Sequence, residues 1–158
     1  MARHPNEELI ERFYKAFDRH DAASMAACYA PHVRFHDPVF LDLEGPVACG
    51  MWKMLCERGK DLRVEVSNIK ADDTKGSAHW DATYTFSVTG RKVLNRIDAT
   101  FELKDGKIVA HRDSFDLWKW TRMALGLKGT LLGWLPPVQG AVRKQARKGL
   151  DEFLASPR

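Results

Sequence analysis

The N-terminal third of the chain shows the hydrophobic spacing of helices. Residues 6–19 place apolar side chains three and four positions apart, which predicts an amphipathic helix capped by Asn6. Asp21 is expected to cap a second, short helix, and Pro46 to begin a third helix that ends near Glu57. The inward positions of the first helix are Leu9, Ile10, Phe13 and Phe17.

Beyond the third helix the pattern changes to strict alternation of apolar and polar residues, which is typical of β-strands. Four segments alternate in this way, at residues 62–71, 77–88, 92–103 and 107–118. Thr89-Gly90 and Asp105-Gly106 separate the last three segments and are strong hairpin turns. A further short strand is expected at residues 31–37. The order predicts an α+β fold, with three N-terminal helices packed on a curved antiparallel sheet.

Composition and charge narrow the class of protein. A chain of 158 residues is long enough for one domain with a sizeable core. Its three cysteines are odd in number and lack metal-ligand spacing, which predicts reduced thiols in a cytoplasmic protein and no metal site. The start of the chain turns acidic where a signal peptide would be apolar.

The net charge of +4 is unevenly distributed, because residues 117–150 contain seven Lys and Arg residues and no acid. Residues 119–158 are expected to form a helical C-terminal extension that ends in a basic amphipathic helix. Residues 130–137 are expected to be a loop.

Three interpretations of the extension stay open. It is a lid over the rest of the protein, a contact with a dimer partner, or a peripheral membrane contact through residues 119–150. A transmembrane span is excluded, because the longest uncharged run has 14 residues and contains two prolines. Nucleic-acid binding is not expected, because the aromatic residues belong to an apolar run.

Two motifs carry a family resemblance. An Asp-Pro-Val segment at residues 37–39 follows the second helix, and the sequence DGKIVAHRDSFD occupies residues 105–116. With the order of helices and strands, these motifs resemble the SnoaL-like branch of the NTF2-like superfamily, which is related to ketosteroid isomerase and limonene-epoxide hydrolase. The resemblance covers residues 7–118. It implies a cystatin-like cone with a pocket between sheet and helices, a domain boundary between residues 1–118 and 119–158, and a homodimer.

Strand alternation predicts which side chains line that pocket. The expected lining residues are Phe13, Phe35, Trp80, Tyr84, Phe86, Asn95 and Ile97. Val88 falls on the same face by parity. Because the lining is mostly apolar, the expected ligand is a small hydrophobic molecule of lipid, polyketide or terpenoid type. Asp37, His111 and Asp113 are charged or titratable exceptions, and a buried charge costs several kcal/mol unless it is paired or its pKa shifts.

Asp37 occupies the position that matches the general base of ketosteroid isomerase. The alternative is that Asp37 only caps a turn at Pro38. The resemblance to a true ketosteroid isomerase fails at the oxyanion hole. Phe13 stands at the position of the family's tyrosine, with Tyr14 about 100° further round the helix, and parity turns Asp98 outward.

Asp113 matches an acid/base residue of limonene-epoxide hydrolase, but Phe35 and Asp37 replace that family's tyrosine and asparagine. His111 shares a strand face with Asp113, two positions away. The enzyme hypothesis is therefore cofactor-independent isomerisation, dehydration or epoxide hydrolysis, with Asp37 as base, His111 as acid and Asp113 orienting the histidine. The competing hypotheses are a non-catalytic carrier of an apolar ligand and an assembly module.

Overall fold

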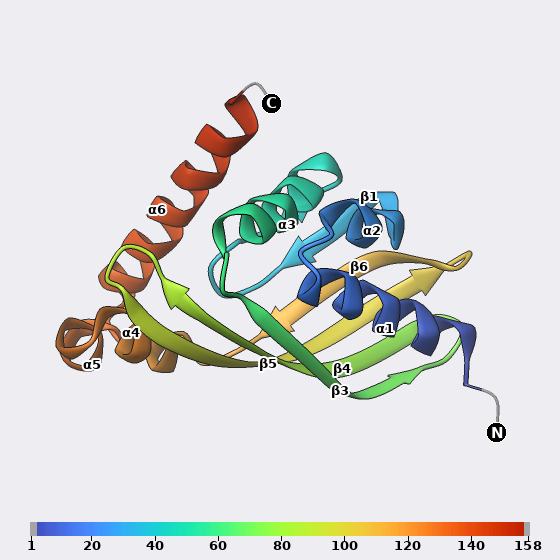
Figure 1. Cartoon of the computed structure of the whole chain (residues 1–158), viewed down its shortest axis with the longest axis horizontal. Coiled ribbons are helices and arrows are strands. Elements are labelled where there is room, and N and C mark those ends of the chain that lie inside the picture. The colour runs from blue at the N-terminus through green and yellow to red at the C-terminus, as the bar shows by residue number, and fades with distance from the viewer. Residues whose placement is uncertain (1–2, 157–158) are drawn as a thin grey trace.

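Three N-terminal helices lie on one face of a curved sheet in the computed structural model, which describes residues 3–156 (Figure 1). The helices are α1 (Pro5–Asp18), α2 (Ala22–Ala27) and α3 (Pro46–Arg58). The strands are β1 (Tyr29–His36), β2 (Leu43–Glu44), β3 (Arg63–Ala71), β4 (Lys75–Phe86), β5 (Arg91–Lys104) and β6 (Lys107–Ser114). The expected α+β fold is confirmed.

The sheet is mixed and not antiparallel throughout, which corrects the expectation from the sequence. Its strand order is β2-β1-β6-β5-β4-β3, and β1 pairs with β6 in parallel, while the other neighbours are antiparallel. A parallel pair needs a long connection, which α3 and the strands from β3 to β5 supply. This pairing sets Phe35 of β1 opposite His111 of β6.

Strand alternation holds along most of the sheet. On β5 every second residue from Val93 to Leu103 is buried, and the Asp105-Gly106 turn has both residues in the left-handed region, as a tight hairpin requires. The expectation fails at Val88, which is 78% exposed because β4 ends at Phe86 and Val88 lies in the hairpin turn.

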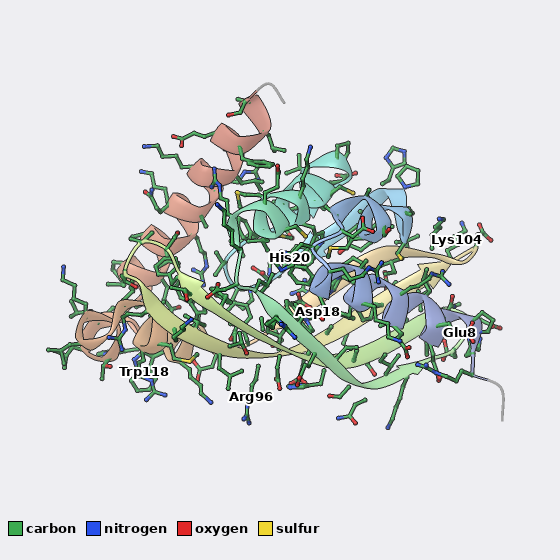
Figure 2. All side chains as sticks on the ribbon, viewed as in Figure 1. Glu8, Asp18, His20, Arg96, Lys104 and Trp118 are labelled. Carbon is green, nitrogen blue, oxygen red and sulfur yellow. The ribbon has the colours of Figure 1, made fainter. Side chains whose placement is uncertain are left out.

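The space between the helices and the sheet is occupied by side chains from both layers (Figure 2). Most of the large ones are aromatic, with ring centroids 5.0 to 6.3 Å apart across the cluster. The buried aromatic residues that make these ring contacts are Phe13, Tyr14, Phe17, Tyr29, Phe35, Trp52, Trp80 and Phe101. The cone is therefore closely filled in its central part.

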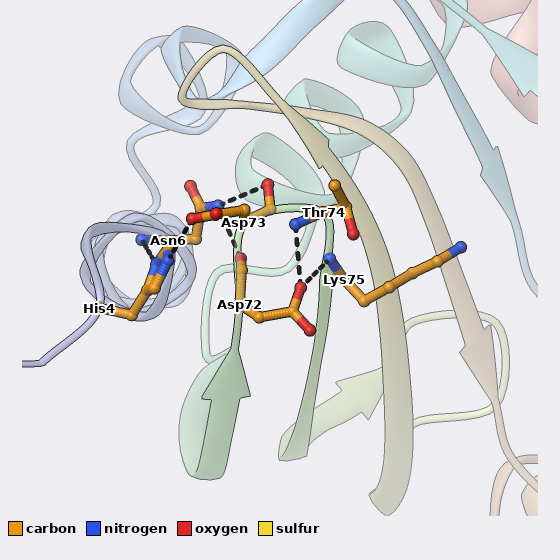
Figure 3. A network of polar contacts seen from close by, with 6 residues as sticks. All are labelled: His4, Asn6, Asp72, Asp73, Thr74 and Lys75. Carbon is orange, nitrogen blue, oxygen red and sulfur yellow. Dashed lines mark hydrogen bonds and ion pairs between the residues drawn. The ribbon is translucent and has the colours of Figure 1, made fainter.

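The start of α1 is tied to the β3–β4 turn (Figure 3). Asn6 is not the cap: the His4 Nδ1 atom accepts the hydrogen bond from the backbone N–H of Asn6 at 3.0 Å. The Asn6 amide instead donates to the carbonyls of Asp72 and Asp73, at 2.9 and 3.3 Å. The Asp72 carboxylate holds the same turn by accepting from the N–H groups of Thr74 and Lys75.

The C-terminal extension consists of α4 (Leu117–Leu125), α5 (Leu127–Leu132) and α6 (Pro136–Ala155). Gly126, with φ of 67°, ends α4. Of the expected loop, α5 includes residues 130–132 and α6 residues 136–137, so only residues 133–135 lie outside helices. Trp120 of α4 donates its indole N–H to the Tyr84 hydroxyl at 2.7 Å. α6 packs on α3 through the buried residues Leu150 and Phe153.

Gly50 of α3 marks the closest approach of α6, because a Cβ atom there would lie 2.3 Å from Leu154 Cδ2. Across residues 3–156, no helix has both the length and the apolar character that a bilayer crossing demands.

We expect Asn6→Ala to lower the free energy of unfolding by about 1–3 kcal/mol, because two turn carbonyls lose their donor at a position that is only 7% exposed. Urea unfolding measures this. Gln145→Ala, which removes an exposed amide from α6, is the control and should change the value by less than about 0.5 kcal/mol. Equal stability of the two variants would contradict the role of Asn6.

Candidate functional site

The candidate site is centred on His111, whose two ring nitrogens both have hydrogen-bond partners. The Tyr29 hydroxyl lies 2.7 Å from His111 Nδ1, and Asp113 Oδ1 lies 2.8 Å from Nε2. The Trp52 indole N–H donates to the Tyr29 hydroxyl at 2.8 Å. A carboxylate oxygen can only accept, so His111 carries a proton on Nε2 and donates it to Asp113. In the neutral ring Nδ1 then accepts from the Tyr29 hydroxyl, which itself accepts from the Trp52 indole.

Asp113 is the open end of this hydrogen-bond chain. Its Oδ1 atom also accepts from the indole N–H of Trp80 at 3.3 Å. Its Oδ2 atom is buried and has no hydrogen-bond partner within residues 3–156. A buried carboxylate oxygen without a donor is uncommon in folded proteins and needs a reason. Among the atoms of this hydrogen-bond chain, Asp113 Oδ2 is thus the one that can still accept a hydrogen bond from a hydroxyl group or a water molecule, or bind a proton.

Tyr14 reaches the same place from α1. Its hydroxyl lies 3.5 Å from His111 Nε2, a long contact. Burial raises the pKa of Tyr14 well above its usual value, and the nearby Asp113 carboxylate adds to this. Burial and Asp113 act in the same direction on the pKa of Tyr29. Both hydroxyl groups therefore keep their protons over the whole physiological range.

Asp37 lies just beyond the end of β1 and combines the two roles that the sequence presents as alternatives. Its Oδ1 accepts from the backbone N–H groups of Val39 and Phe40, at 2.7 and 2.5 Å, so it does hold a turn. Burial nevertheless raises its pKa to about 7, against the lowering effect of the Phe40 N–H, and repulsion from Asp113 contributes to the rise. A carboxyl group with this pKa can give or take a proton near neutral pH.

The expected lining residues divide into two groups. Phe13, Phe35, Trp80 and Ile97 belong to the main core, where the Phe13 and Phe35 rings stand edge-on to His111 at 5.6 and 5.0 Å. Phe86 packs in a second cluster with Trp120 under α4, and Tyr84 packs against both clusters. Asn95 is buried on β5, opposite Ala82 of β4.

Asp37 connects the two groups electrostatically. The pKa of Tyr84 is raised by burial and, to a smaller extent, by Asp37, while Asp113 acts on Asp37 from the other side. The turn that carries Asp37 is also held by α6, because Arg143 Nε donates to the Pro38 carbonyl at 2.7 Å.

The His111–Asp113 end of the site is closed in this structure, whereas Asp37 is half-buried. The side chains of His111 and Asp113 are 0% and 1% exposed. Two open hollows on the described surface lie elsewhere, one lined by Glu7 and the β3–β4 turn and the other by Asp18, Arg19 and the 60–63 segment. Neither contains an expected site residue.

Three residues of the hydrogen-bond chain were not expected from the sequence, namely Tyr14, Tyr29 and Trp52. Tyr14 was set aside because Phe13 fills the tyrosine position, but the buried stripe of α1 is wide enough for both. The spacing of Ile10, Tyr14 and Phe17 alone already places Tyr14 on the buried face of the helix. Tyr29 has the same parity as Val33 and was missed because β1 begins two residues earlier than expected.

Comparison with known proteins agrees with this architecture. A family model described as the SnoaL-like domain matches residues 10–111. No protein of curated function matches the sequence at a significant level.

Several solved structures are similar over most of the chain. A candidate polyketide cyclase of Xanthomonas campestris is 21% identical, covers 77% of this chain and 97% of its own, and has a TM-score of 0.65. An LEH-like epoxide hydrolase of M. tuberculosis is 19% identical, with 84% and 96% covered and a TM-score of 0.62. An NTF2-like protein of unknown function from Burkholderia pseudomallei is 19% identical, with 76% and 97% covered and a TM-score of 0.66.

At these identities the structural matches show the fold, while the family model covers well over half of the sequence. The chain therefore belongs to the SnoaL-like family of the NTF2-like superfamily.

Proposed function

We propose that this SnoaL-like protein catalyses cofactor-independent proton transfer on a small hydrophobic molecule, in an isomerisation, dehydration or epoxide-opening reaction. The observation that carries the proposal is the unpartnered Oδ2 of Asp113, buried in an aromatic core and electrostatically coupled to Asp37. Two carboxyl groups in different environments are a recurrent arrangement for acid/base catalysis, because one can hold a proton while the other accepts one.

The hydrogen bonds favour a division of roles that reverses the one inferred from the sequence. Both nitrogens of His111 are already engaged, by Tyr29 and by Asp113, so the imidazole has no atom left for a substrate. His111 is therefore a positioning residue that holds Asp113 Oδ1 and directs Oδ2 toward the reacting molecule. Asp37, with a pKa of about 7, is the partner that exchanges the second proton.

Substrate entry requires displacement of the side chains that cover the site. The cover at the Asp37 end comes from the C-terminal extension, where Trp120 is bonded to Tyr84 and Arg143 to the Pro38 carbonyl. α4 is also tied to the β4–β5 hairpin by hydrogen bonds from Thr89 to the Ala124 carbonyl and from Arg91 to the Met123 carbonyl, and it packs in a small apolar cluster with Val93. Because this cluster is smaller than the ring-packed interior around Phe13 and Trp52, the extension is the part that opens at lower cost.

A second function, non-catalytic binding of an apolar molecule, is favoured by the composition of the interior. Except for Asp113 Oδ2, the polar side-chain atoms of the hydrogen-bond chain that runs from Trp52 through Tyr29, His111 and Asp113 to Trp80 form hydrogen bonds with one another. The surrounding rings supply a large apolar area, as small-molecule sites generally do. A carrier would bind the same molecules and release them unchanged.

We expect Asp113→Asn and Asp37→Asn each to lower turnover by about 100-fold or more, because each removes a proton-transfer group. The assay incubates the protein with α,β-unsaturated ketones, β-hydroxy ketones and terpene epoxides, followed by mass spectrometry of the products. Asp105→Asn is the matched control, since Asp105 lies exposed in the β5–β6 turn at a φ of 52°, which asparagine tolerates. Turnover that survives in both site variants would overturn the catalytic roles, and binding without turnover would establish the carrier.

The raised pKa of Asp37 also predicts a pH dependence of stability that needs no substrate. The folded protein binds this proton more tightly than the unfolded chain does, so its contribution is complete below about pH 4 and is lost as the pH rises through about 7. We expect the wild-type free energy of unfolding, measured relative to Asp37→Asn, to fall by on the order of 2 kcal/mol across that range. The difference in free energy of unfolding between the wild type and Asp105→Asn should not change with pH across that range. A flat profile for Asp37→Asn as well would show that the Asp37 pKa is not raised.

The tautomer of His111 tests the positioning role. In the wild type we expect the proton on Nε2, because Tyr29 donates to Nδ1. Tyr29→Phe removes that donor and should give a mixed or inverted tautomer, visible in two-dimensional 15N–1H spectra of histidine-labelled protein. Tyr84→Phe, which removes a half-buried hydroxyl that is not part of this hydrogen-bond chain, should leave the His111 signals in place. An Nδ1-protonated wild type would contradict the assigned direction of the hydrogen bonds.

A further inference from the structure

Most of the large apolar side chains that are exposed in the C-terminal extension lie in or beside α5. We call them the α5 patch: Trp118, Leu127, Leu131, Leu132 and Trp134, which are 37% to 75% exposed. α5 and α4 lie at the end of the sheet remote from the start of α1, and Figure 2 shows Trp118 at this end. Single exposed apolar residues are ordinary, but a cluster of large ones on one short segment marks a binding surface.

The patch is a fixed part of the fold. The backbones of α4 and α5 are in contact, because a Cβ atom at Gly129 would lie 1.9 Å from the Thr121 carbonyl oxygen. Trp118 donates its indole N–H to the Thr130 carbonyl at 3.3 Å, and Trp134 donates to the Leu131 carbonyl at 3.1 Å. Both tryptophans therefore lie against α5 with their polar atoms satisfied.

The segment that carries the patch is basic. Residues 117–150 contain seven basic residues and no acid. Arg122 stacks on the Trp118 ring at 4.8 Å, and Arg143 and Arg147 have partners within the protein. The remaining four are exposed and form no ion pair within residues 3–156: Lys119, Lys128, Lys144 and Lys148.

We propose that the α5 patch docks on an anionic membrane surface. Transfer of leucine and tryptophan side chains from water into the headgroup region lowers the free energy, and tryptophan is favoured at that depth. Each lysine close to an anionic surface adds about 1 kcal/mol of attraction. The unpaired lysines complement such a surface, whereas a second copy of this chain would bring the same positive charges to the contact. The contact is peripheral, and it is independent of the chemistry proposed for Asp37 and Asp113.

The test is sedimentation of the full chain with vesicles of phosphatidylcholine, with and without phosphatidylglycerol. We expect binding to the vesicles that contain phosphatidylglycerol, weakening as sodium chloride is added. Leu131→Ser combined with Trp134→Ser should reduce binding about tenfold or more. Leu94→Thr, which alters an exposed leucine on the outer sheet face, is the matched control and should bind as the wild type does.

Charge-reversal variants measure the electrostatic contribution to vesicle binding. Lys128→Glu should reduce binding about fivefold or more, and Arg96→Glu, on the outer face of β5 (Figure 2), should change it far less. Circular dichroism checks that each variant is folded.

Three outcomes would overturn the proposal. They are a wild type that stays in the supernatant, binding that is equal on neutral vesicles, and patch variants that sediment like the wild type. Light scattering identifies the competing occupant. A wild-type dimer that the Leu131→Ser/Trp134→Ser variant converts to a monomer, without vesicle binding, would assign the patch to a second copy of the chain.

Discussion

The structure depends most on the pairing of a buried imidazole with a buried carboxylate. His111 and Asp113 lie in an aromatic core with no exposed polar surface, where either group alone would be costly. Each layer of the fold contributes to satisfying them: β1 supplies Tyr29, α3 supplies Trp52 and β4 supplies Trp80. The parallel pairing of β1 with β6 brings the first of these within reach. The topology of the sheet and the hydrogen-bond chain therefore require each other.

The same constraint explains why one oxygen is left without a partner. His111 has a single proton to give once Tyr29 has fixed its tautomer, and that proton goes to Asp113 Oδ1, where Trp80 also points. No donor within residues 3–156 remains for Oδ2, and the carboxyl groups of Asp113 and Asp37 repel each other. A purely structural aspartate would gain stability from a second donor or from replacement by a neutral residue. Retaining the unpartnered oxygen is the kind of local cost that active sites keep.

Much of the fold and part of the site could be predicted from the sequence. Period-two alternation placed Trp80, His111 and Asp113 on the inner face, and helical spacing placed Phe13 there. What alternation does not encode is which strands are neighbours, so the parallel β1–β6 pair and the contact of Tyr29 with His111 were out of reach. Tyr14 and Trp52 were missed for a different reason. A tyrosine or tryptophan is compatible with either a core wall or a polar contact, and only the three-dimensional partner decides between them.

The C-terminal extension divides two neighbouring tryptophans of α4 between a buried and an exposed side. Trp118 and Trp120 are two positions apart on α4, so helical geometry sends them to opposite sides: Trp120 turns in to Tyr84, and Trp118 turns out to the α5 patch. The extension is therefore both the cover of the Asp37 end and the carrier of the exposed apolar surface. Movement of α4 away from the sheet has to break the Trp120–Tyr84 bond and shift the patch together, because α4 and α5 are in backbone contact. On the two proposals made above, a membrane that holds the α5 patch also acts on the side chains that close the site, because α4 carries both Trp118 and Trp120.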